Sequence, residues 1–163
     1  MPAPPKYTAE VLLPMFRRAA TLRNEMRAAG FTDNGGAIHS AERILDILGQ
    51  RLCYPRLSHI AGIRSHPNAE FTEAALAAHR RGEKVRIEHV APLRALTMEV
   101  IALHADGRTD DELLDHVRRH YRLVLLTAEE TQALNHSNRS KMDADRIAHL
   151  RVVRPGVSKS GAS

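Results

Sequence analysis

Apolar side chains recur every three or four positions near the start of the chain, between residues 8 and 29. This spacing is typical of an amphipathic helix. Thr8 is the expected N-cap of that helix, and Gly30 fits its C-terminal stop. The predicted apolar face consists of Leu12, Met15, Ala19, Leu22 and Met26.

Two further helices are predicted in the first half of the chain. One begins at Ser40, which can act as its N-cap, and runs to about Leu52. The other is the segment EFTEAALAAHRRGEK, which begins at residue 70 and ends near Gly82. Between them, residues 53–70 contain two prolines and a glycine, so this stretch is predicted as a loop with one short element.

Strand patterns appear only in the second half of the chain. The segment KVRIEHVAPL, residues 84–93, predicts a short strand that ends in Glu88 and His89. The segment YRLVLL, residues 121–126, predicts a second strand.

Helix-start signals surround these strands. Pro92 can occupy the first position of a helix, where its missing N–H costs nothing. Thr109 and Thr127 each begin a capping box, one before and one after the second strand. We therefore expect an α+β fold that is mainly α-helical, with two short strands.

Composition agrees with an ordinary globular protein, with 43% hydrophobic and 26% charged residues. A length of 163 residues suits one compact domain, or a small domain with an extra lobe. The single cysteine, Cys53, excludes an internal disulfide and a zinc site built of cysteines. We find neither a signal peptide nor a span of about 20 apolar residues, and therefore expect a cytoplasmic protein with no membrane partner.

Basic residues exceed acidic ones, with a formal net charge of +5 and a pI of about 9.9. Such a balance favours polyanions such as nucleic acid. Two sets of cations form either solvated surfaces or phosphate-binding surfaces. The first set, on the polar side of the first helix, is Arg17, Arg18, Arg23 and Arg27. The second set, near the C-terminus, is Arg139, Lys141, Arg146, Arg151 and Arg154.

Histidine is also frequent, with 10 in the chain. His116 and His120 lie at positions i and i+4 of one predicted helix, a spacing that can bind zinc. The Glu that would complete an H-E-x-x-H motif is missing beside His116.

The order of acid–His pair, second strand and capped helix suggests a particular chemistry. A histidine at a strand end can act as a general base and take a proton from an attacking water. A neighbouring carboxylate can bind a hard cation such as Mg²⁺, which prefers oxygen ligands. The following helix can supply a further ligand, and the metal then stabilises charge that develops on a phosphate.

These segments resemble a known family. EHVAPL is similar to the D/E-H-x-x-P segment of the HNH, or ββα-metal (His-Me finger), nucleases, and YRLVLLTAEETQAL is similar to the second strand and helix of that finger. With the later RSKM, the pattern resembles a group of uncharacterised HNH-like proteins of bacteria and phages. The resemblance covers about residues 84–142 and implies a split ββα finger with an inserted pair of helices.

The resemblance implies a metal-dependent endonuclease that hydrolyses phosphodiester bonds, in DNA rather than RNA. His89 matches the general base and Glu88 the metal-binding acid. The helix ligand would be Glu130, Thr131 or Asn135, and the metal Mg²⁺ or Mn²⁺. The basic residues expected to contact nucleic acid are Arg86, Arg139, Lys141 and Arg146.

Other interpretations stay open from the residues alone. Neighbours in a strand point to opposite faces, so Glu88 and His89 share a metal only if the strand ends at the pair. Glu130 also fits as the capping partner of Thr127. The middle Asn of the HNH motif has no clear counterpart here. The finger would then be degenerate, in a non-catalytic nucleic-acid-binding protein or a helical protein-interaction protein, either of them phage-related.

The predicted organisation along the chain has four parts. These are a flexible N-terminus at residues 1–7, a helical region at 8–82, an HNH-like region at 83–150 and a basic, disordered tail at 151–163.

Overall fold

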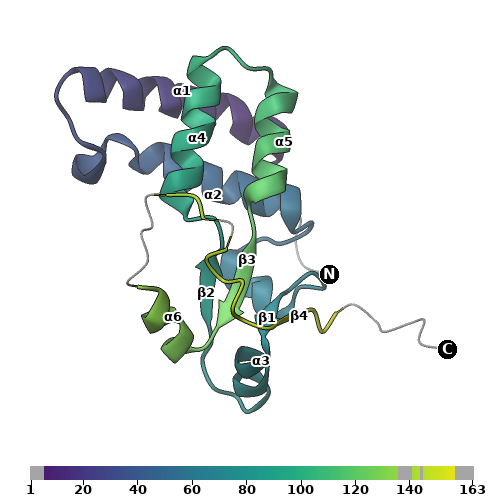
Figure 1. Ribbon diagram of the computed structural model, residues 1–163. Helices are drawn as coiled ribbons and strands as arrows, with labels where there is room; N and C mark the ends of the chain where they lie inside the picture. The colour runs from purple at the N-terminus through teal and green to yellow at the C-terminus, as the bar shows by residue number, and fades with distance from the viewer. Residues whose placement is uncertain (1–5, 136–140, 144, 157–163) are drawn as a thin grey trace.

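The fold is α+β and mainly α-helical, as the sequence predicts (Figure 1). The structure, a computed structural model, describes residues 6–135, 141–143 and 145–156. Within this part of the chain, a group of long helices packs above a small sheet, and two shorter helices flank the sheet (Figure 1). No helix in these ranges is long and apolar enough to cross a membrane.

The long helices are α1 (Ala9–Ala28), α2 (His39–Cys53), α4 (Leu93–Ala105) and α5 (Asp110–His120). The short helices are α3 (Glu73–Arg80) and α6 (Ala128–Leu134), and two short helical segments, η1 (Asp33–Ala37) and η2 (Ile60–Ser65), lie in the connections. The hydroxyl of Thr8 accepts the N–H of Val11, which confirms the predicted start of α1. Both capping boxes, at Thr109 and Thr127, are present.

Three local expectations for the helices are wrong. Residue 38 precedes the first turn of α2, so Ser40 lies inside that helix and does not cap it. The third helix begins only after Thr72, whose hydroxyl caps it by accepting the N–H of Ala75. In α1 the buried face consists of Leu12, Leu13, Phe16, Ala19 and Ala20, whereas Met15 and Leu22 of the predicted face are exposed.

The sheet is mixed, with strand order β2-β3-β1-β4. The strands predicted from sequence, β2 (Arg86–His89) and β3 (Leu123–Leu126), pair antiparallel. Two strands of two residues were not predicted: β1 (Phe71–Thr72) runs parallel to β3, and β4 (Val152–Val153) runs antiparallel to β1. Pairing with β1 therefore holds the chain at residues 152–153, which corrects the predicted start of a disordered tail at residue 151.

Strand β3 is buried on both faces and separates two apolar clusters. Leu123 and Leu125 belong to the large core that the long helices share with the sheet. Val124 and Leu126 face the other side, where Leu134 of α6 and Ile147 cover them. Burial on both faces explains the uninterrupted apolar run in this strand.

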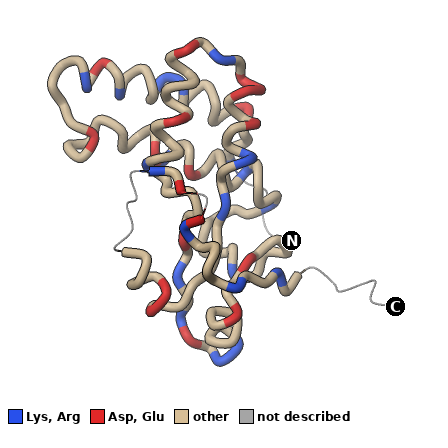
Figure 2. The backbone as a smooth tube through the Cα atoms, in the orientation of Figure 1, with Lys and Arg blue, Asp and Glu red and all other residues tan. Residues whose placement is uncertain are grey.

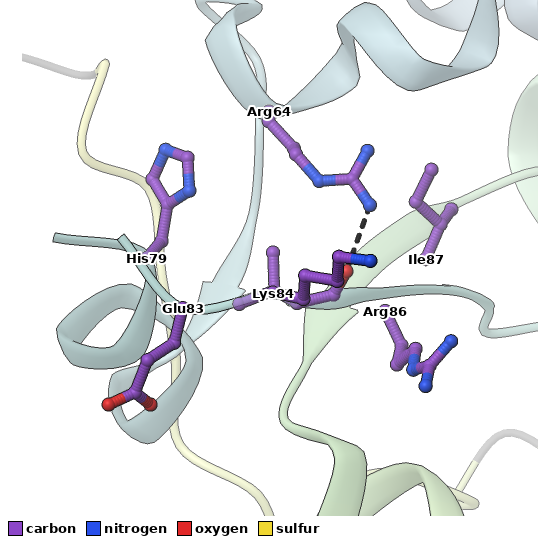
Figure 3. Close-up of a pocket in the computed structure, with 7 residues that line it drawn as sticks. Arg64, His79, Glu83, Lys84, Arg86 and Ile87 are labelled. Carbon is purple, nitrogen blue, oxygen red and sulfur yellow. Dashed lines mark hydrogen bonds between the residues drawn. The ribbon is translucent and has the colours of Figure 1, made fainter. Parts of the chain in front are cut away.

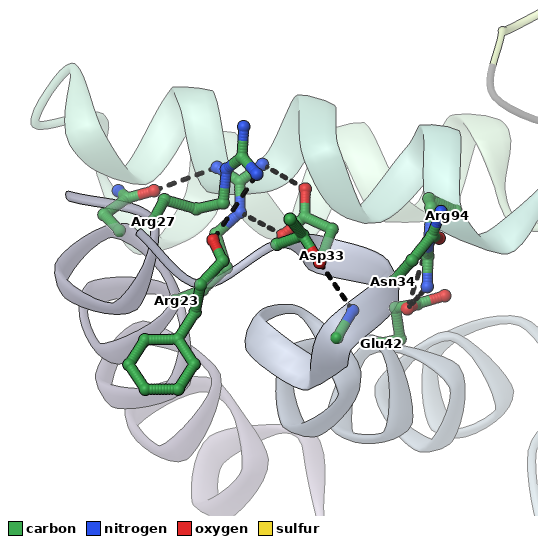
Figure 4. Close-up of polar contacts among 10 residues, drawn as sticks. Arg23, Arg27, Asp33, Asn34, Glu42 and Arg94 are labelled. Atoms are coloured by element: carbon green, nitrogen blue, oxygen red, sulfur yellow. Dashed lines mark hydrogen bonds and ion pairs between the residues drawn. The ribbon is translucent and has the colours of Figure 1, made fainter. Parts of the chain in front are cut away.

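Polar contacts hold the connection between α1 and α2 (Figure 4). Arg23 donates two hydrogen bonds to the carboxylate of Asp33, at 2.9 and 2.7 Å. Arg94, at the start of α4, donates to Glu42 at 2.8 Å and to the side chain of Asn34. Arg23 therefore stabilises the connection between α1 and α2. The sequence had predicted it on a solvated or phosphate-contacting face of the first helix.

Candidate active site at the end of strand β2

His89, the last residue of β2, forms a hydrogen bond with a helix of the N-terminal region. Its Nε2 lies 2.8 Å from Oδ1 of Asp46, which projects from the middle of α2. The phenol of Tyr121 donates a hydrogen bond of 2.6 Å to the same oxygen. One carboxylate thus orients both an imidazole and a phenol, and it joins segments 43 and 75 residues apart in the sequence.

Packing between α2 and the start of β3 fixes these three side chains. Tyr121 follows the last turn of α5, and its ring meets the imidazole of His89 edge-on, with centroids 5.7 Å apart. Gly49 of α2 leaves room for the Tyr121 ring, because a Cβ at position 49 would lie 2.2 Å from Cδ2 of the tyrosine. The orientation of His89 therefore depends on a close approach between a helix and an aromatic ring.

Electrostatics keep the carboxyl of Asp46 ionised. Burial alone would raise the pKa of Asp46, but the hydrogen bond and charge of His89, with hydrogen bonds from Tyr121 and Gln50, outweigh burial and lower that pKa. Burial and the nearby Asp46 raise the pKa of Tyr121, so its phenol stays protonated and donates. Because an ionised carboxylate can only accept a hydrogen bond, Nε2 of His89 carries a proton and donates the hydrogen bond to Asp46.

The other ring nitrogen of His89 is available. Among the described residues, no hydrogen-bond partner lies at Nδ1 of this imidazole. The side chain is 23% exposed and borders a hollow of about 240 Å³ at the strand end. Other residues that line this hollow are Ile87, Glu88, Pro92, Leu93 and Arg94.

Glu88 faces the opposite side of the sheet from His89. Its carboxylate is buried and forms an ion pair with the guanidinium of Arg146, which is also buried. Arg146 donates a further hydrogen bond of 2.8 Å to the carbonyl oxygen of His89. The strand continues regularly through both residues, which pair with Val124 and Leu123 of β3, so the two side chains do not converge on one point.

The residues predicted as metal ligands have other contacts in this structure. Oε1 of Glu130 accepts the N–H of Thr127 at 2.9 Å and the hydroxyl of Thr72 at 2.6 Å. Thr131 donates its hydroxyl to the carbonyl oxygen of Thr127 within α6. Asn135 is the exposed C-cap residue of α6.

These contacts do not fit a bound Mg²⁺ or Mn²⁺. Glu88 is already neutralised by Arg146, and Glu130 caps its own helix. In the described part of the chain, no group of three or more His, Cys, Asp or Glu residues is arranged to hold a metal ion. His136 and Asn138, which also follow the helix in sequence, lie outside the described residues.

The predicted nucleic-acid contacts separate into exposed and buried residues. Arg86 and Lys141 are exposed, whereas Arg146 is only 5% exposed and is bound to Glu88, so its guanidinium is not presented to a nucleic-acid backbone. Arg139 lies outside the described residues. Figure 2 shows basic and acidic residues interspersed over both the helices and the sheet.

The histidine pair considered for zinc lies elsewhere, between α4 and α5. The rings of His116 and His120 contact each other with centroids 4.5 Å apart. Nε2 of His116 lies 3.8 Å from Oε2 of Glu99. These three side chains are not among any potential metal-binding group in the described ranges.

Asp46 and Tyr121 were not identified from the sequence as site residues. Asp46 does carry a local signal, because it interrupts the apolar run Ile44, Leu45, Ile47 and Leu48 on the core side of its helix. A carboxylate at such a position needs a partner. The sequence around Asp46 does not indicate that this partner is His89.

Comparison with known proteins does not identify a family for this chain. No family model matches the chain, and no significant match is found among curated proteins or solved structures. The resemblance to HNH nucleases therefore stays a prediction from the residues.

Proposed function

We propose that this protein hydrolyses phosphodiester bonds in DNA and that His89 is its general base. The observation that carries this proposal is the hydrogen-bonded pair of Asp46 and His89 at the end of β2, with Nδ1 of the imidazole available beside a hollow. Carboxylate–imidazole pairs of this kind orient a catalytic histidine in many hydrolases.

The proton transfer follows from the hydrogen bonds. Asp46 accepts a hydrogen bond from Nε2–H, which leaves the Nδ1 lone pair of neutral His89 free to take a proton from a water. The resulting imidazolium is stabilised by the ionised carboxylate 2.8 Å away. The water oxygen bonds to phosphorus as the bond from phosphorus to the leaving oxygen breaks, and the imidazolium can give its proton to that oxygen. Tyr121 holds the second lone-pair direction of the same oxygen, so Asp46 cannot rotate away from the ring without losing a hydrogen bond.

The arrangement of elements also supports an HNH-like frame. Strand β2 carries the histidine at its end, β3 pairs antiparallel with it, and α6 follows β3 directly and packs on both strands. Helices α4 and α5 form the inserted pair. The described residues offer no metal site, so no step above involves a metal ion. The requirement for Mg²⁺ or Mn²⁺ that the resemblance implies is a separate prediction.

The test is a cleavage assay on supercoiled plasmid with purified protein. Wild type is compared with His89→Ala and with His149→Ala, an exposed histidine that has no hydrogen bond with Asp46, each with Mg²⁺, with Mn²⁺ and with chelator. We expect wild type and His149→Ala to nick the plasmid and His89→Ala to lose at least 100-fold in rate, the usual contribution of a general base.

The metal arms and the variants answer different questions. Loss of nicking in chelator would support the Mg²⁺ or Mn²⁺ requirement, with ligands from outside the described residues. Nicking that persists unchanged in His89→Ala would contradict the proposal. So would the absence of cleavage under every condition, which would leave the non-catalytic binding protein as the better interpretation.

A further inference from the structure

Strand β2 lies at the edge of the sheet, and two hollows meet along it. The hollow beside His89 lies at the end of the strand, and a larger one of about 590 Å³ lies at its start (Figure 3). Ile87 lines both, so the two hollows are neighbours along the strand, and we name them together the β2 groove. The large hollow is lined by Arg64, His79, Glu83, Lys84, Val85 and Arg86.

The start of the β2 groove is positively charged. Among the described residues, no carboxylate lies within ion-pair distance of Arg64, Lys84 or Arg86. Glu83 is the acidic residue of the lining, and Arg81 binds its carboxylate at 2.9 and 3.1 Å. In Figure 3 the Glu83 carboxylate points away from the ends of Arg64 and Lys84, which approach the same space from two sides.

Arg64 is held in place and not merely exposed at the surface. Its guanidinium donates to the carbonyl oxygen of Val85 at 2.8 Å and to that of Ala61 at 3.3 Å. Both partners are neutral, so its full charge remains available to a ligand. Guanidinium groups with fixed orientation are suited to binding phosphate oxygens.

The two ends of the β2 groove differ in charge. At the His89 end, Arg94 is paired with Glu42, and Glu88 is paired with Arg146. Charge that can attract an anion therefore lies at the start of the strand, and the candidate base lies at its end. Arg86 and His89 are separated by three residue steps, or about 10 Å of extended chain.

From this arrangement we infer that one strand of DNA lies along the β2 groove. The phosphates that flank the cleaved bond bind Arg64 and Lys84 on one side of the strand and Arg86 on the other, across the exposed edge of β2, while the reacting phosphate reaches His89. The inference rests on the proposed function for its substrate, and it adds the path and direction of the substrate on the protein.

The experiment measures binding separately from cleavage. A fluorescently labelled DNA duplex is titrated with the full chain carrying His89→Ala, and anisotropy is followed at several salt concentrations. Lys84→Gln and Arg86→Gln are then added together, since both side chains are exposed and their loss leaves the core intact. We expect at least tenfold weaker binding. The slope of the logarithm of the binding constant against the logarithm of salt concentration should decrease in magnitude by about two.

The matched control removes two charges that do not line the β2 groove. Arg108→Gln and Arg118→Gln change exposed residues in and before α5 and lower the net charge by the same amount. We expect this control to retain the salt dependence of the parent. Equal weakening in both double variants would mean that net charge alone drives binding, and it would overturn the inference.

The cleavage readout separates this inference from the proposed function. Weaker binding in the Lys84→Gln and Arg86→Gln variant, with no cleavage by wild type, would support the β2 groove as a DNA-binding site while the hydrolysis proposal fails. Wild-type cleavage that the same two substitutions leave unchanged, with unchanged binding, would overturn the groove while the hydrolysis proposal stands.

Discussion

Glu88 and Arg146 form an ion pair from which solvent is almost completely excluded, with side chains 5% and 2% exposed. Removing one partner of such a pair leaves a buried charge, and this typically costs about 3–5 kcal/mol. We therefore predict that Arg146→Met lowers the free energy of unfolding by that amount, measured by urea denaturation.

The double variant Glu88→Gln and Arg146→Met provides the control, because it removes both charges together. It is expected to recover much of the stability that Arg146→Met loses. If Arg146→Met unfolds at the urea concentration of wild type, Arg146 does not have the structural role described here and remains a candidate for contacting nucleic acid.

At the same scale, the separation of Glu88 from His89 follows from a rule that applies to every strand. Side chains alternate along a strand, so adjacent residues separate to opposite faces. The sequence does not show that Glu88 pairs with Arg146, which is 58 residues away, or that His89 pairs with Asp46, which is 43 residues away. Such contacts depend on the packing of the whole chain.

At the scale of elements, the approach of α2 to Tyr121 leads to a second prediction. Replacing a helical glycine by alanine ordinarily stabilises a helix by about 1 kcal/mol. At Gly49, however, the new Cβ would lie 2.2 Å from the tyrosine ring. We predict that Gly49→Ala destabilises the protein by about 1–3 kcal/mol through overpacking, measured by thermal or urea unfolding.

Gly49→Ala should also disturb the site. The displaced Tyr121 ring would lose its hydrogen bond to Asp46 and its contact with His89. The matched control is Gly82→Ala, at a position where an added Cβ meets nothing within 4 Å but where a φ of +80° disfavours alanine. Lower stability in both variants, with slower cleavage only in Gly49→Ala, is the expected result. Unchanged stability of Gly49→Ala would contradict the close packing.

The interface of α4 and α5 contains a pH-sensitive contact. Burial and the charges of His120 and Arg119 lower the pKa of His116, although Glu99 acts in the opposite direction. The folded state therefore binds this proton less readily than the unfolded state, whose histidine pKa is about 6.5. Stability should be complete above that pH and should fall as pH decreases toward the folded pKa.

We predict that His116→Gln reduces this loss of stability on acidification. The measurement is urea unfolding of wild type and variant at pH 7.5 and at pH 5. A difference between the two pH values that is the same in both proteins would contradict the role of His116.

Elements with strong local signals were predictable from the sequence, and those without were not. The capping boxes at Thr109 and Thr127 use residues only three positions apart, and both are present as predicted. By contrast, β1 and β4 have two residues each, too few to show a strand periodicity, and they exist because each pairs with a distant segment.

At the scale of the whole molecule, the predicted helical and HNH-like regions contribute to one core and one site. Buried residues of α1, α2, α4 and α5 belong to the same apolar cluster as Leu123 and Leu125 of the sheet. The Asp46–His89 pair likewise spans the boundary predicted between residues 82 and 83. The N-terminal helices therefore supply the carboxylate that orients the candidate base, a role that the resemblance alone did not imply.

The most direct test of this account is the rate of plasmid nicking by Asp46→Asn relative to wild type, with DNA binding measured on the same samples. The substitution keeps the size of the side chain but removes the charge that orients His89 and stabilises its imidazolium. We predict a loss of about 100- to 10⁴-fold in rate, because Asp→Asn at the orienting carboxylate of a Ser-His-Asp triad costs about 10⁴-fold, with unchanged DNA binding. A folded Asp46→Asn protein that nicks DNA at the wild-type rate would contradict the account.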